Sequence, residues 1–317
     1  YIGVDVGGTK ISAALLDPYG GILCREKQPT IRTAKPAIIG RQIEKIIKEV
    51  LAESRVSLSS LGGIGIGIPG IVAPHTNKIL VTPNICLTGY PLAERLKKVF
   101  RTKIVLGNDV NLGTLAEKWL GVGKNAQNII GIFLGTGVGG GIIINGKIVT
   151  GAQGAAGELG HMIIDLHSPV SSAGVFGTLE ALASRRAIER DIREAIRSGK
   201  KSIIKELADG NLRVIKSKAL RKALKKKDPV VKEVLDKVCM VVGKACISLR
   251  HIFNPEMIIL GGGVMEACGD YILPRVQKIS EKDPFLAGID QCSIVESVLK
   301  DDAVILGAVA LMKQAKQ

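Results

Sequence analysis

The sequence predicts an α/β protein made of two similarly built halves. Two segments support this prediction, because each has an apolar strand, a glycine-rich turn and a second apolar strand, at residues 2–16 and again at residues 129–144. Segments with helical periodicity, most clearly residues 36–54, lie between such strands. With 317 residues, the chain is long enough for about two domains of roughly 150 residues each.

The first half opens as a meander of strands around the turn Gly7–Lys10. A helix is predicted next because seven Ile, Val and Leu residues recur at helical spacing with charged residues between them. The expected elements are strands at 2–6 and 11–16, a helix at 36–54, strands at 62–69 and 103–107, and a helix at 112–120.

The second half repeats this order after residue 128 and then becomes mostly helical. A glycine turn again joins two strands, and Asn145-Gly146 is typical of a tight hairpin turn. The expected elements are strands at 129–134 and 142–144, a helical region at 178–250, a strand at 255–260 ending in a glycine turn, and a closing helix at 301–316.

Composition excludes global disorder, since 46% of the residues are hydrophobic and can form a core. The net charge of +15 and the pI near 9.6 would suit a nucleic-acid binder, an anionic substrate or merely a basic surface. Residues 181–230 alone hold 16 Lys and Arg against 6 Asp and Glu, without interleaved aromatic residues. We therefore interpret this segment as a solvated helical face and expect no nucleic-acid partner.

The six cysteines lie apart, without a C-x-x-C pair, which favours reduced thiols and a cytoplasmic protein. No leader-like segment opens the chain. The long uncharged stretches at 57–74 and 125–145 are rich in glycine and β-branched residues, so we interpret them as buried strands and expect no membrane association.

Three glycine turns follow strands, at Gly7–Lys10, Gly135–Gly137 and Gly261–Gly263. Glycine lets backbone N–H groups approach phosphate oxygens closely, although a hairpin or a packed strand end also favours glycine. Neither a P-loop nor a dinucleotide-binding G-x-G-x-x-G between strand and helix is present in the sequence. Three such turns together indicate phosphate binding by another fold.

Five motifs in order resemble the ROK family of bacterial sugar kinases and sugar-responsive repressors. They are Asp5-Val-Gly-Gly-Thr-Lys, Gly107-Asn-Asp-Val-Asn, Gly135-Thr-Gly-Val-Gly-Gly-Gly, Gly157-Glu-Leu-Gly-His and Gly261-Gly-Gly. The resemblance implies a two-lobed actin-like, ribonuclease H-like fold with a hexokinase-type cleft that binds ATP and a sugar. We expect an N-terminal lobe at 1–108 completed by the helix at 301–317, and a second lobe at 109–300 with a helical insertion at about 178–250.

The resemblance gives Asp109 the role of the general base that accepts a proton from the sugar hydroxyl. The alternative for Asp109 is a helix N-cap. Asp5 lies in a strand, where an unpaired carboxylate is costly, and is expected to interact with Mg²⁺ through water. The alternative is a carboxylate bonded to backbone amides. The ATP site is expected to include Asp5, Gly7, Gly8, Thr9, Lys10, Gly135, Thr136, Gly137, Gly139, Gly140, Gly262 and Gly263.

The resemblance likewise implies a sugar site made of polar side chains and loop glycine. Glu158 and His161 are three residues apart and could face the same ligand, while His161 alone would be interpreted as a structural histidine. Glu180 could instead be a first-turn carboxylate of the following helix. The expected sugar-binding residues are Gly70, Asn84, Asn108, Asp109, Glu158, His161 and Glu180.

One segment departs from the family. Most members bind a structural zinc with that histidine and three cysteines, whose positions here fall on Ser171, Ala173 and Thr178. Because these residues cannot provide thiolates, we expect no zinc site and a loop around Val175 and Phe176 held by apolar packing.

The resemblance therefore predicts an ATP- and Mg²⁺-dependent kinase acting on the 6-hydroxyl of glucose or a related hexose. N-acetylmannosamine, N-acetylglucosamine, mannose or fructose are alternative substrates. A sugar-responsive regulator is disfavoured because only four residues precede Asp5, and a sugar-binding pseudokinase or assembly protein would not need Asp109, Glu158, His161 and Glu180 together. A homodimer or homotetramer is expected.

Overall fold

The computed structural model describes residues 1–208, 210–286, 288 and 291–315. By its internal contacts the chain divides into two compact units. Unit 1 comprises Tyr1–Asn125, Gly141–Gly157 and Val298–Gln317, and unit 2 comprises Ala126–Gly140 and Glu158–Ser297. Residues 109–125 and 141–157 thus group with the first unit, whereas we expected the second lobe to begin at residue 109.

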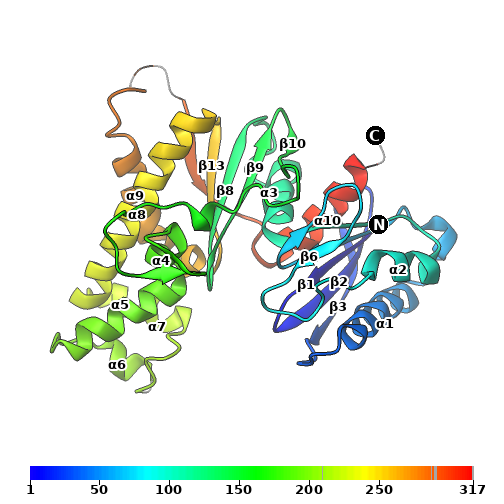
Figure 1. The fold of residues 1–317 in the computed structure, drawn as a ribbon, viewed down its shortest axis with the longest axis horizontal. Helices are drawn as coiled ribbons and strands as arrows, with labels where there is room; N and C mark the ends of the chain where they lie inside the picture. Colours follow the sequence, from blue (N-terminus) through cyan, green and yellow to red (C-terminus); the bar gives the residue numbers. More distant parts are fainter. Residues whose placement is uncertain (209, 287, 289–290, 316–317) are drawn as a thin grey trace. The chain divides into compact units, whose positions relative to one another are not determined.

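Unit 1 is built around a five-stranded mixed sheet with the order β3-β2-β1-β4-β7 (Figure 1). The first three strands are antiparallel neighbours, and β4 and β7 continue in parallel from β1, which confirms the expected meander. The strands are β1 (Ile2–Val6), β2 (Lys10–Leu16), β3 (Ile22–Pro29), β4 (Ile64–Ile68) and β7 (Ile104–Asn108), and the short pair β5 (Ile71–Val72) and β6 (Ile79–Val81) follows β4.

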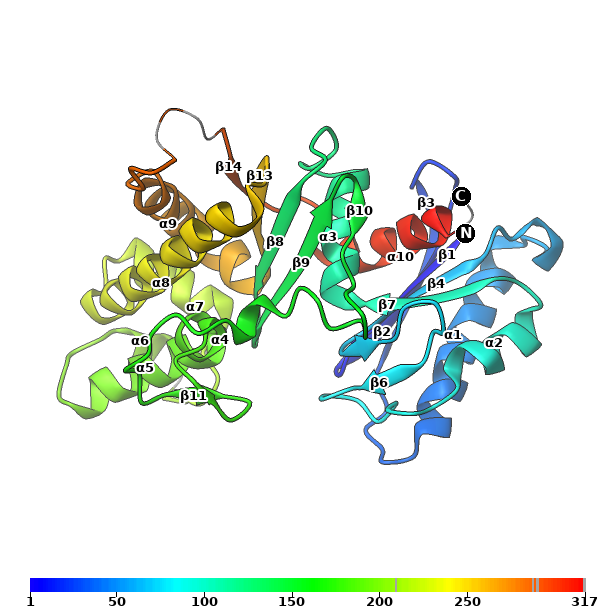
Figure 2. The same ribbon diagram turned by 45° about the horizontal axis from the view of Figure 1, so that its top comes forward.

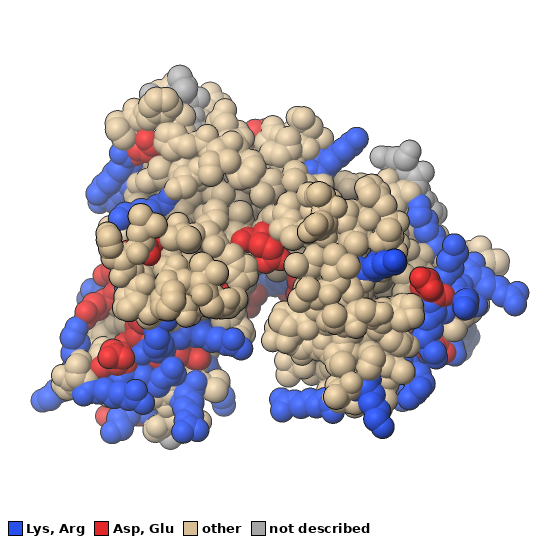
Figure 3. Space-filling view, in the orientation of Figure 1, with Lys and Arg blue, Asp and Glu red and all other residues tan. Residues whose placement is uncertain are grey.

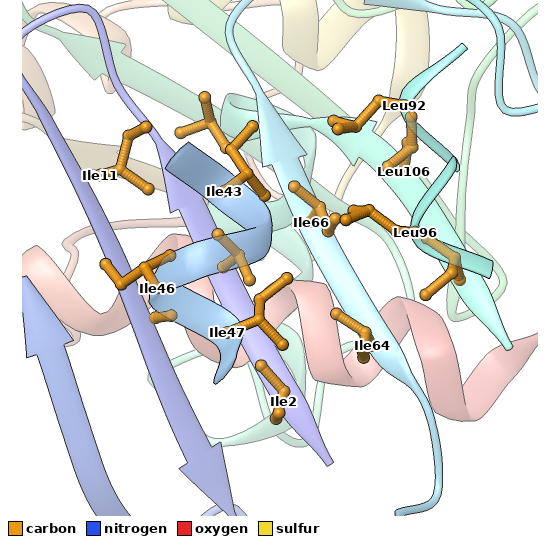
Figure 4. Packing of buried hydrophobic residues seen from close by; sticks show 14 of the residues in the cluster. Ile2, Ile11, Ile43, Ile46, Ile47, Ile64, Ile66, Leu92, Leu96 and Leu106 are labelled. Carbon is orange, nitrogen blue, oxygen red and sulfur yellow. The ribbon is translucent and has the colours of Figure 1, made fainter. Parts of the chain in front are cut away.

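Helices cover both faces of this sheet. On one face, α1 (Pro36–Ser54) and α2 (Leu92–Phe100) bury the Ile- and Leu-rich cluster that Figure 4 shows, in which Ile43, Ile47 and Ile66 are fully buried. On the other face lie α3 (Asp109–Trp119) and α10 (Ala303–Gln314), packed against Ala14 and Leu16. Burial of these apolar side chains is the main stabilising term for the unit.

Close backbone packing joins α3 and α10 to each other and to the sheet. A Cβ added at Gly307 would lie 1.8 Å from the carbonyl oxygen of Leu112, and one added at Gly65 would lie 2.0 Å from that of Ala308. The buried carboxylate of Glu117 accepts hydrogen bonds from the N–H groups of Val298 and Leu299, each at 2.9 Å. These contacts fix the chain that leads into α10.

The second five-stranded sheet has the order β10-β9-β8-β13-β14. This order repeats that of the first sheet, so the prediction of two similarly built halves is confirmed. The strands are β8 (Ile129–Leu134), β9 (Val138–Ile144), β10 (Lys147–Ile148), β13 (Met257–Gly261) and β14 (Ser293–Glu296), and the unit boundary runs through β9.

Unit 2 also contains the expected helical region (Figures 1 and 2). The longest of its helices, α8, begins at Pro229 behind the N-cap Asp228, whose side chain accepts from the N–H of Val231. The helices are α4 (Leu179–Ala183), α5 (Arg185–Arg197), α6 (Ile204–Leu207), α7 (Ser217–Lys225), α8 (Pro229–Phe253) and α9 (Gly263–Ser280), with a 3₁₀ turn at Leu159–His161. The 3₁₀ turns at Leu58–Ser60 and Lys300–Asp302 belong to unit 1.

Most basic residues of this region are exposed, and Figure 3 shows them gathered over α5 to α7. In α7, Ala219, Leu220 and Ala223 are buried, while Lys222 and Lys225 are exposed. The interpretation of a solvated helical face is confirmed for these side chains.

Several element boundaries differ from the sequence-based prediction, among them those of two helices. The helix expected from Leu112 begins at Asp109, because the Asn108 side chain caps it by accepting from the N–H of Asn111. The closing helix covers Ala303–Gln314, and residues 316–317 of the expected range lie outside the described residues. Within the described ranges, no helix is both long and apolar enough to cross a membrane.

Candidate active site

The first glycine turn joins β1 to β2 in unit 1. The N–H of Gly7 donates to the carbonyl oxygen of Lys10 at 2.9 Å, and the Thr30 hydroxyl donates to the Gly7 carbonyl at 2.6 Å. Gly8 and Thr9 are exposed at the tip, and a Cβ on Gly8 would lie 3.2 Å from the carbonyl oxygen of Asn84. The structure thus brings Asn84, a predicted sugar-site residue, next to the predicted phosphate turn.

Asp5 lies on β1, just before this turn. Burial raises the pKa of Asp5 to about 6, and the charge of Lys10 partly opposes that shift. Lys10 itself forms an ion pair with Asp301, with 3.1 Å between Nζ and Oδ2. A buried carboxylate with a raised pKa is stabilised by a nearby cation, so Asp5 fits a position close to Mg²⁺.

Asn108 and Asp109 lie where β7 passes into α3. Asn108 is the N-cap of this helix, and its Nδ2 also donates to the carbonyl of Gly70 at 2.9 Å. Asp109 is therefore the first helical residue and not the cap, and its Oδ1 accepts from the N–H of Val110 at 2.9 Å. The cap alternative for Asp109 is wrong, since the preceding residue fills that position.

Gly70 is held by a close backbone approach. Its φ is +137°, a region that L residues rarely adopt, and a Cβ there would lie 2.0 Å from the carbonyl oxygen of Val81. Together with the hydrogen bond from Asn108, this geometry places Gly70 beside the start of α3.

The second glycine turn joins β8 to β9, and its backbone is tied to α4 in unit 2. The carboxylate of Glu180 accepts from the N–H of Val138 at 2.9 Å through Oε2 and from the Ser172 hydroxyl through Oε1. A Cβ on Gly137 would lie 2.1 Å from Glu180 Oε2. A side chain at 137 would therefore displace this carboxylate from the N–H of Val138, and Thr136 stands exposed at the tip.

The third glycine turn lies against the second. Gly262 has a φ of +86° and precedes α9, and a Cβ there would lie 2.6 Å from the carbonyl oxygen of Leu134. The N–H of Arg185 donates to Gly135 O at 2.9 Å, and its Nη2 donates to Gly263 O at 3.1 Å. Arg185 thereby joins the two turns, a role that no motif in the sequence predicts.

Glu158 and His161 lie together in one 3₁₀ turn. The His161 N–H donates to the Glu158 carbonyl at 3.0 Å, and both side chains are exposed. Glu158 is the N-cap of this 3₁₀ turn and His161 is its last residue. Gly139 and Gly140, also predicted for the ATP site, lie on β9.

The segment that replaces the family's zinc loop is held by polar contacts. The two-residue strands β11 (Ser171–Ser172) and β12 (Val175–Phe176) form a hairpin, and Thr178 is buried with its hydroxyl accepting from the N–H of Ala181. Val175 and Phe176 are 40% and 59% exposed, so the expectation of apolar packing is wrong.

Backbone hydrogen bonds anchor this hairpin instead. The N–H of Gly177 donates to Val170 O at 2.9 Å, and that of Leu179 donates to Met162 O at 2.8 Å. In the part of the chain that the structure describes, no group of three or more His, Cys, Asp or Glu side chains is placed to hold a metal ion.

The site residues therefore form two sets. In unit 1, the turn Gly7–Lys10 lies near Asn84, and Asn108 joins Gly70 to the start of α3. In unit 2, Glu180 and Arg185 bring the second and third glycine turns together. Gly137 lies against the carboxylate of Glu180 and Gly262 against the backbone of Leu134, so a Cβ at either position would displace its neighbour.

Comparison with solved structures identifies the class of fold. A ROK family glucokinase from Streptomyces griseus, solved in complex with glucose and AMPPNP, superposes with a TM-score of 0.82 at 30% identity, over 99% of both chains. The chain has the two-lobed actin-like ATPase fold of such proteins.

The family model described as ROK family matches residues 1–315, and the chain belongs to this family. Glucokinases from Halalkalibacterium halodurans and Thermotoga maritima are each 34% identical over 99% of this chain and 95% and 97% of theirs. The xylose repressor of Caldicellulosiruptor bescii is 30% identical over 98% of this chain and 77% of its own.

Proposed function

We propose that the protein is an ATP-dependent hexose kinase that phosphorylates the 6-hydroxyl of glucose or a related sugar. The observation that carries the proposal is the arrangement at the start of α3, where Asn108 serves as the cap and Asp109 follows as the first helical residue, directly after the end of β7. The likeness to glucokinases along the whole chain supports it.

In this proposal, Asp109 accepts the proton from the sugar hydroxyl as that oxygen attacks phosphorus. Asn108, Asn84, Glu158, His161 and Glu180 bind and orient sugar hydroxyls, and Gly70 keeps the wall beside Asn108 free of a side chain. Orientation of this kind removes much of the entropic barrier to phosphoryl transfer.

ATP with Mg²⁺ supplies the phosphoryl group when bound. The turns Gly7–Lys10, Gly135–Gly140 and Gly262–Gly263 offer backbone N–H groups to its phosphates, and Asp5 interacts with the metal through water. Lys10 is paired with Asp301 in the structure and retains ammonium donors for a phosphate. We also propose a cytoplasmic location and a homodimer or homotetramer.

The variant Asp109→Asn tests the general base directly. Asparagine keeps the Oδ1 acceptor for the N–H of Val110, so the start of α3 is preserved while the proton acceptor is lost. We expect kcat to fall at least about 100-fold with sugar affinity nearly unchanged. The matched control Asp270→Asn, on the exposed surface of α9, should keep full activity.

A coupled assay with ATP, Mg²⁺ and a panel of sugars measures both the reaction and the substrate. The panel includes glucose, mannose, fructose, N-acetylglucosamine and N-acetylmannosamine, since these alternatives share the same general-base chemistry. Activity retained in Asp109→Asn would show that the base is assigned wrongly.

A sugar-responsive regulator is the second candidate, because xylose repressors match this chain at nearly the same identity as some glucokinases. It predicts sugar binding by calorimetry without any turnover of ATP in the same preparation. Turnover that depends on Asp109 would exclude it.

A further inference from the structure

A pocket of about 300 Å³ lies in unit 1 where α3 and α10 end. The two helices run side by side in both ribbon views (Figures 1 and 2). Leu115, Trp119 and Ala310 form its apolar side, and Lys118, Lys124 and Lys313 stand around it. We call it the α3–α10 pocket; none of the residues assigned to ATP or sugar binding lines it.

The charged residues that line the α3–α10 pocket are all positive. Its described lining residues include three lysines and no Asp or Glu. Lys118 Nζ donates to the carbonyl of Lys124 at 3.1 Å, and Lys313 Nζ donates to that of Pro18 at 2.7 Å. Because an ammonium group has three N–H donors, both lysines retain donors for a further acceptor. The complementary ligand group is an anion.

The apolar side of the pocket indicates the size and polarity of the part of the ligand that carries no charge. The Trp119 ring has Lys313 Nζ at 4.6 Å from its centroid, so one cation is already held beside the aromatic surface. The volume lies at the lower end of the range of about 300 to 1,000 Å³ for small-molecule sites. It suits one ring-sized apolar body with one charged group.

The α3–α10 pocket lies at the far end of the helix that carries Asp109. Helix α3 has 11 residues, which corresponds to about 16 Å of helix at 1.5 Å per residue. Backbone contact at Gly307 and Leu112 packs α3 tightly against α10 along this length. The pocket is thus separate from the Asp109 end but belongs to the same rigid pair of helices.

We propose that the α3–α10 pocket binds a small organic anion, a molecule with one phosphate or carboxylate group on an apolar body about the size of one ring. The anion is held by Lys118, Lys124 and Lys313, and the apolar body lies on Leu115, Trp119 and Ala310. This inference does not depend on the kinase proposal, because binding is measured without turnover.

Trp119 is the single tryptophan of the chain, so its fluorescence reports on this pocket. The probe is phenyl phosphate, titrated in parallel with inorganic phosphate alone and phenol alone. We expect a saturable change with phenyl phosphate and a Kd at least about tenfold lower than for either fragment. Absence of a saturable change at millimolar concentration would overturn the proposal, as would competition by ATP at its own Kd.

Two variants test the two sides of the pocket. Lys124→Glu reverses an exposed charge at the pocket and should weaken phenyl phosphate binding at least about tenfold. Lys98→Glu makes the same change on the exposed side of α2 and should leave the Kd unchanged. Ala310→Leu fills the apolar side and should abolish the fluorescence response. Equal binding in Lys124→Glu and Lys98→Glu would overturn the proposal.

Discussion

The two glycine turns that follow β1 and β8 occupy equivalent places in two sheets of the same strand order, yet they are stabilised differently. The first turn is closed by its own backbone and by Thr30, and its tip is open. The second is tied to a helix by Glu180, which accepts from Val138 and from Ser172. Two residues before the turn, β1 carries Asp5, whereas β8 carries Phe133.

This difference shows how one framework can serve two chemical tasks. The strand order positions both turns at a strand end, and the neighbouring side chains then decide what each turn does. A buried carboxylate beside the first turn favours a cation there. A carboxylate engaged by backbone and hydroxyl at the second turn fixes the direction of its N–H groups instead.

The largest change in the free energy of unfolding is expected when a side chain is added in the second glycine turn. In Gly137→Ala the new Cβ meets Glu180 Oε2 at 2.1 Å, and moving that carboxylate breaks its bond to the Val138 N–H. We expect a loss of about 3 kcal/mol in the free energy of unfolding, since a buried donor is left without its acceptor and the turn is displaced. Urea unfolding followed by circular dichroism measures this loss.

Gly135→Ala is the matched control for that variant. A Cβ at Gly135 meets nothing closer than 3.8 Å, so the loss should stay below about 0.5 kcal/mol. Equal losses in the two variants would show that Glu180 does not restrain the second turn.

The next largest change in stability is expected at Asp5, the carboxylate that distinguishes the first glycine turn. Burial raises the pKa of Asp5 from 3.8 to about 6, so between about pH 4 and pH 6 the folded chain holds a proton that the unfolded chain has released. The contribution of Asp5 to stability therefore falls as pH rises through this window. The variant Asp5→Asn removes the free-energy cost of ionising this buried carboxylate. It should be more stable than the wild type by about 2 kcal/mol at neutral pH, with little difference near pH 4.

Asp17→Asn provides a control of opposite sign. Hydrogen bonds from the N–H groups of Gly21 and Tyr19 lower the pKa of Asp17, so its carboxylate favours the folded state once ionised. That variant should lose stability relative to the wild type as pH rises above about 4. Thermal unfolding of the three proteins across this pH range measures both differences, and parallel profiles for the two variants would contradict the assignment of Asp5.

Periodicity and turn chemistry predicted the strands and most helices because local spacing reports which side chains are buried. The helix at 36–54 was predicted with the limits that the structure has, since Ile39, Ile43 and Ile46 mark one buried face. Contacts between residues far apart in the sequence leave no such pattern in residue spacing. Neither the bond from Ser172 to Glu180 nor the bridge that Arg185 makes between Gly135 and Gly263 follows from spacing.

The segment that replaces the family's zinc loop shows the same limit of prediction from sequence. Absence of thiolates at Ser171, Ala173 and Thr178 follows from residue identity, but what replaces their contribution to the loop does not. Buried Thr178 caps α4, and backbone bonds anchor the hairpin where apolar packing was expected. The roles of Asp109, Glu158 and His161 in the site stay predictions.

The smallest change in the free energy of unfolding is expected in a second pair of equivalent turns. These are the two-residue turns of the hairpins β9–β10 and β11–β12. Asn145–Gly146 has φ values of +51° and +75°, and Ala173–Gly174 has +49° and +82°. Such turns require positive φ at both central residues, which asparagine tolerates better than alanine. The two hairpins thus share a backbone, and only the second places alanine in the strained position.

We therefore expect Ala173→Asn to stabilise the protein by about 0.5 kcal/mol, and Asn145→Ala to destabilise it by a similar or larger amount. Ala173 is exposed, so the asparagine side chain can extend into solvent. Paired urea titrations of the two variants and the wild type measure the changes. Destabilisation by Ala173→Asn would mean that alanine at this turn is favoured by a contact other than its backbone conformation, which would separate the two hairpins as clearly as Glu180 separates the two glycine turns.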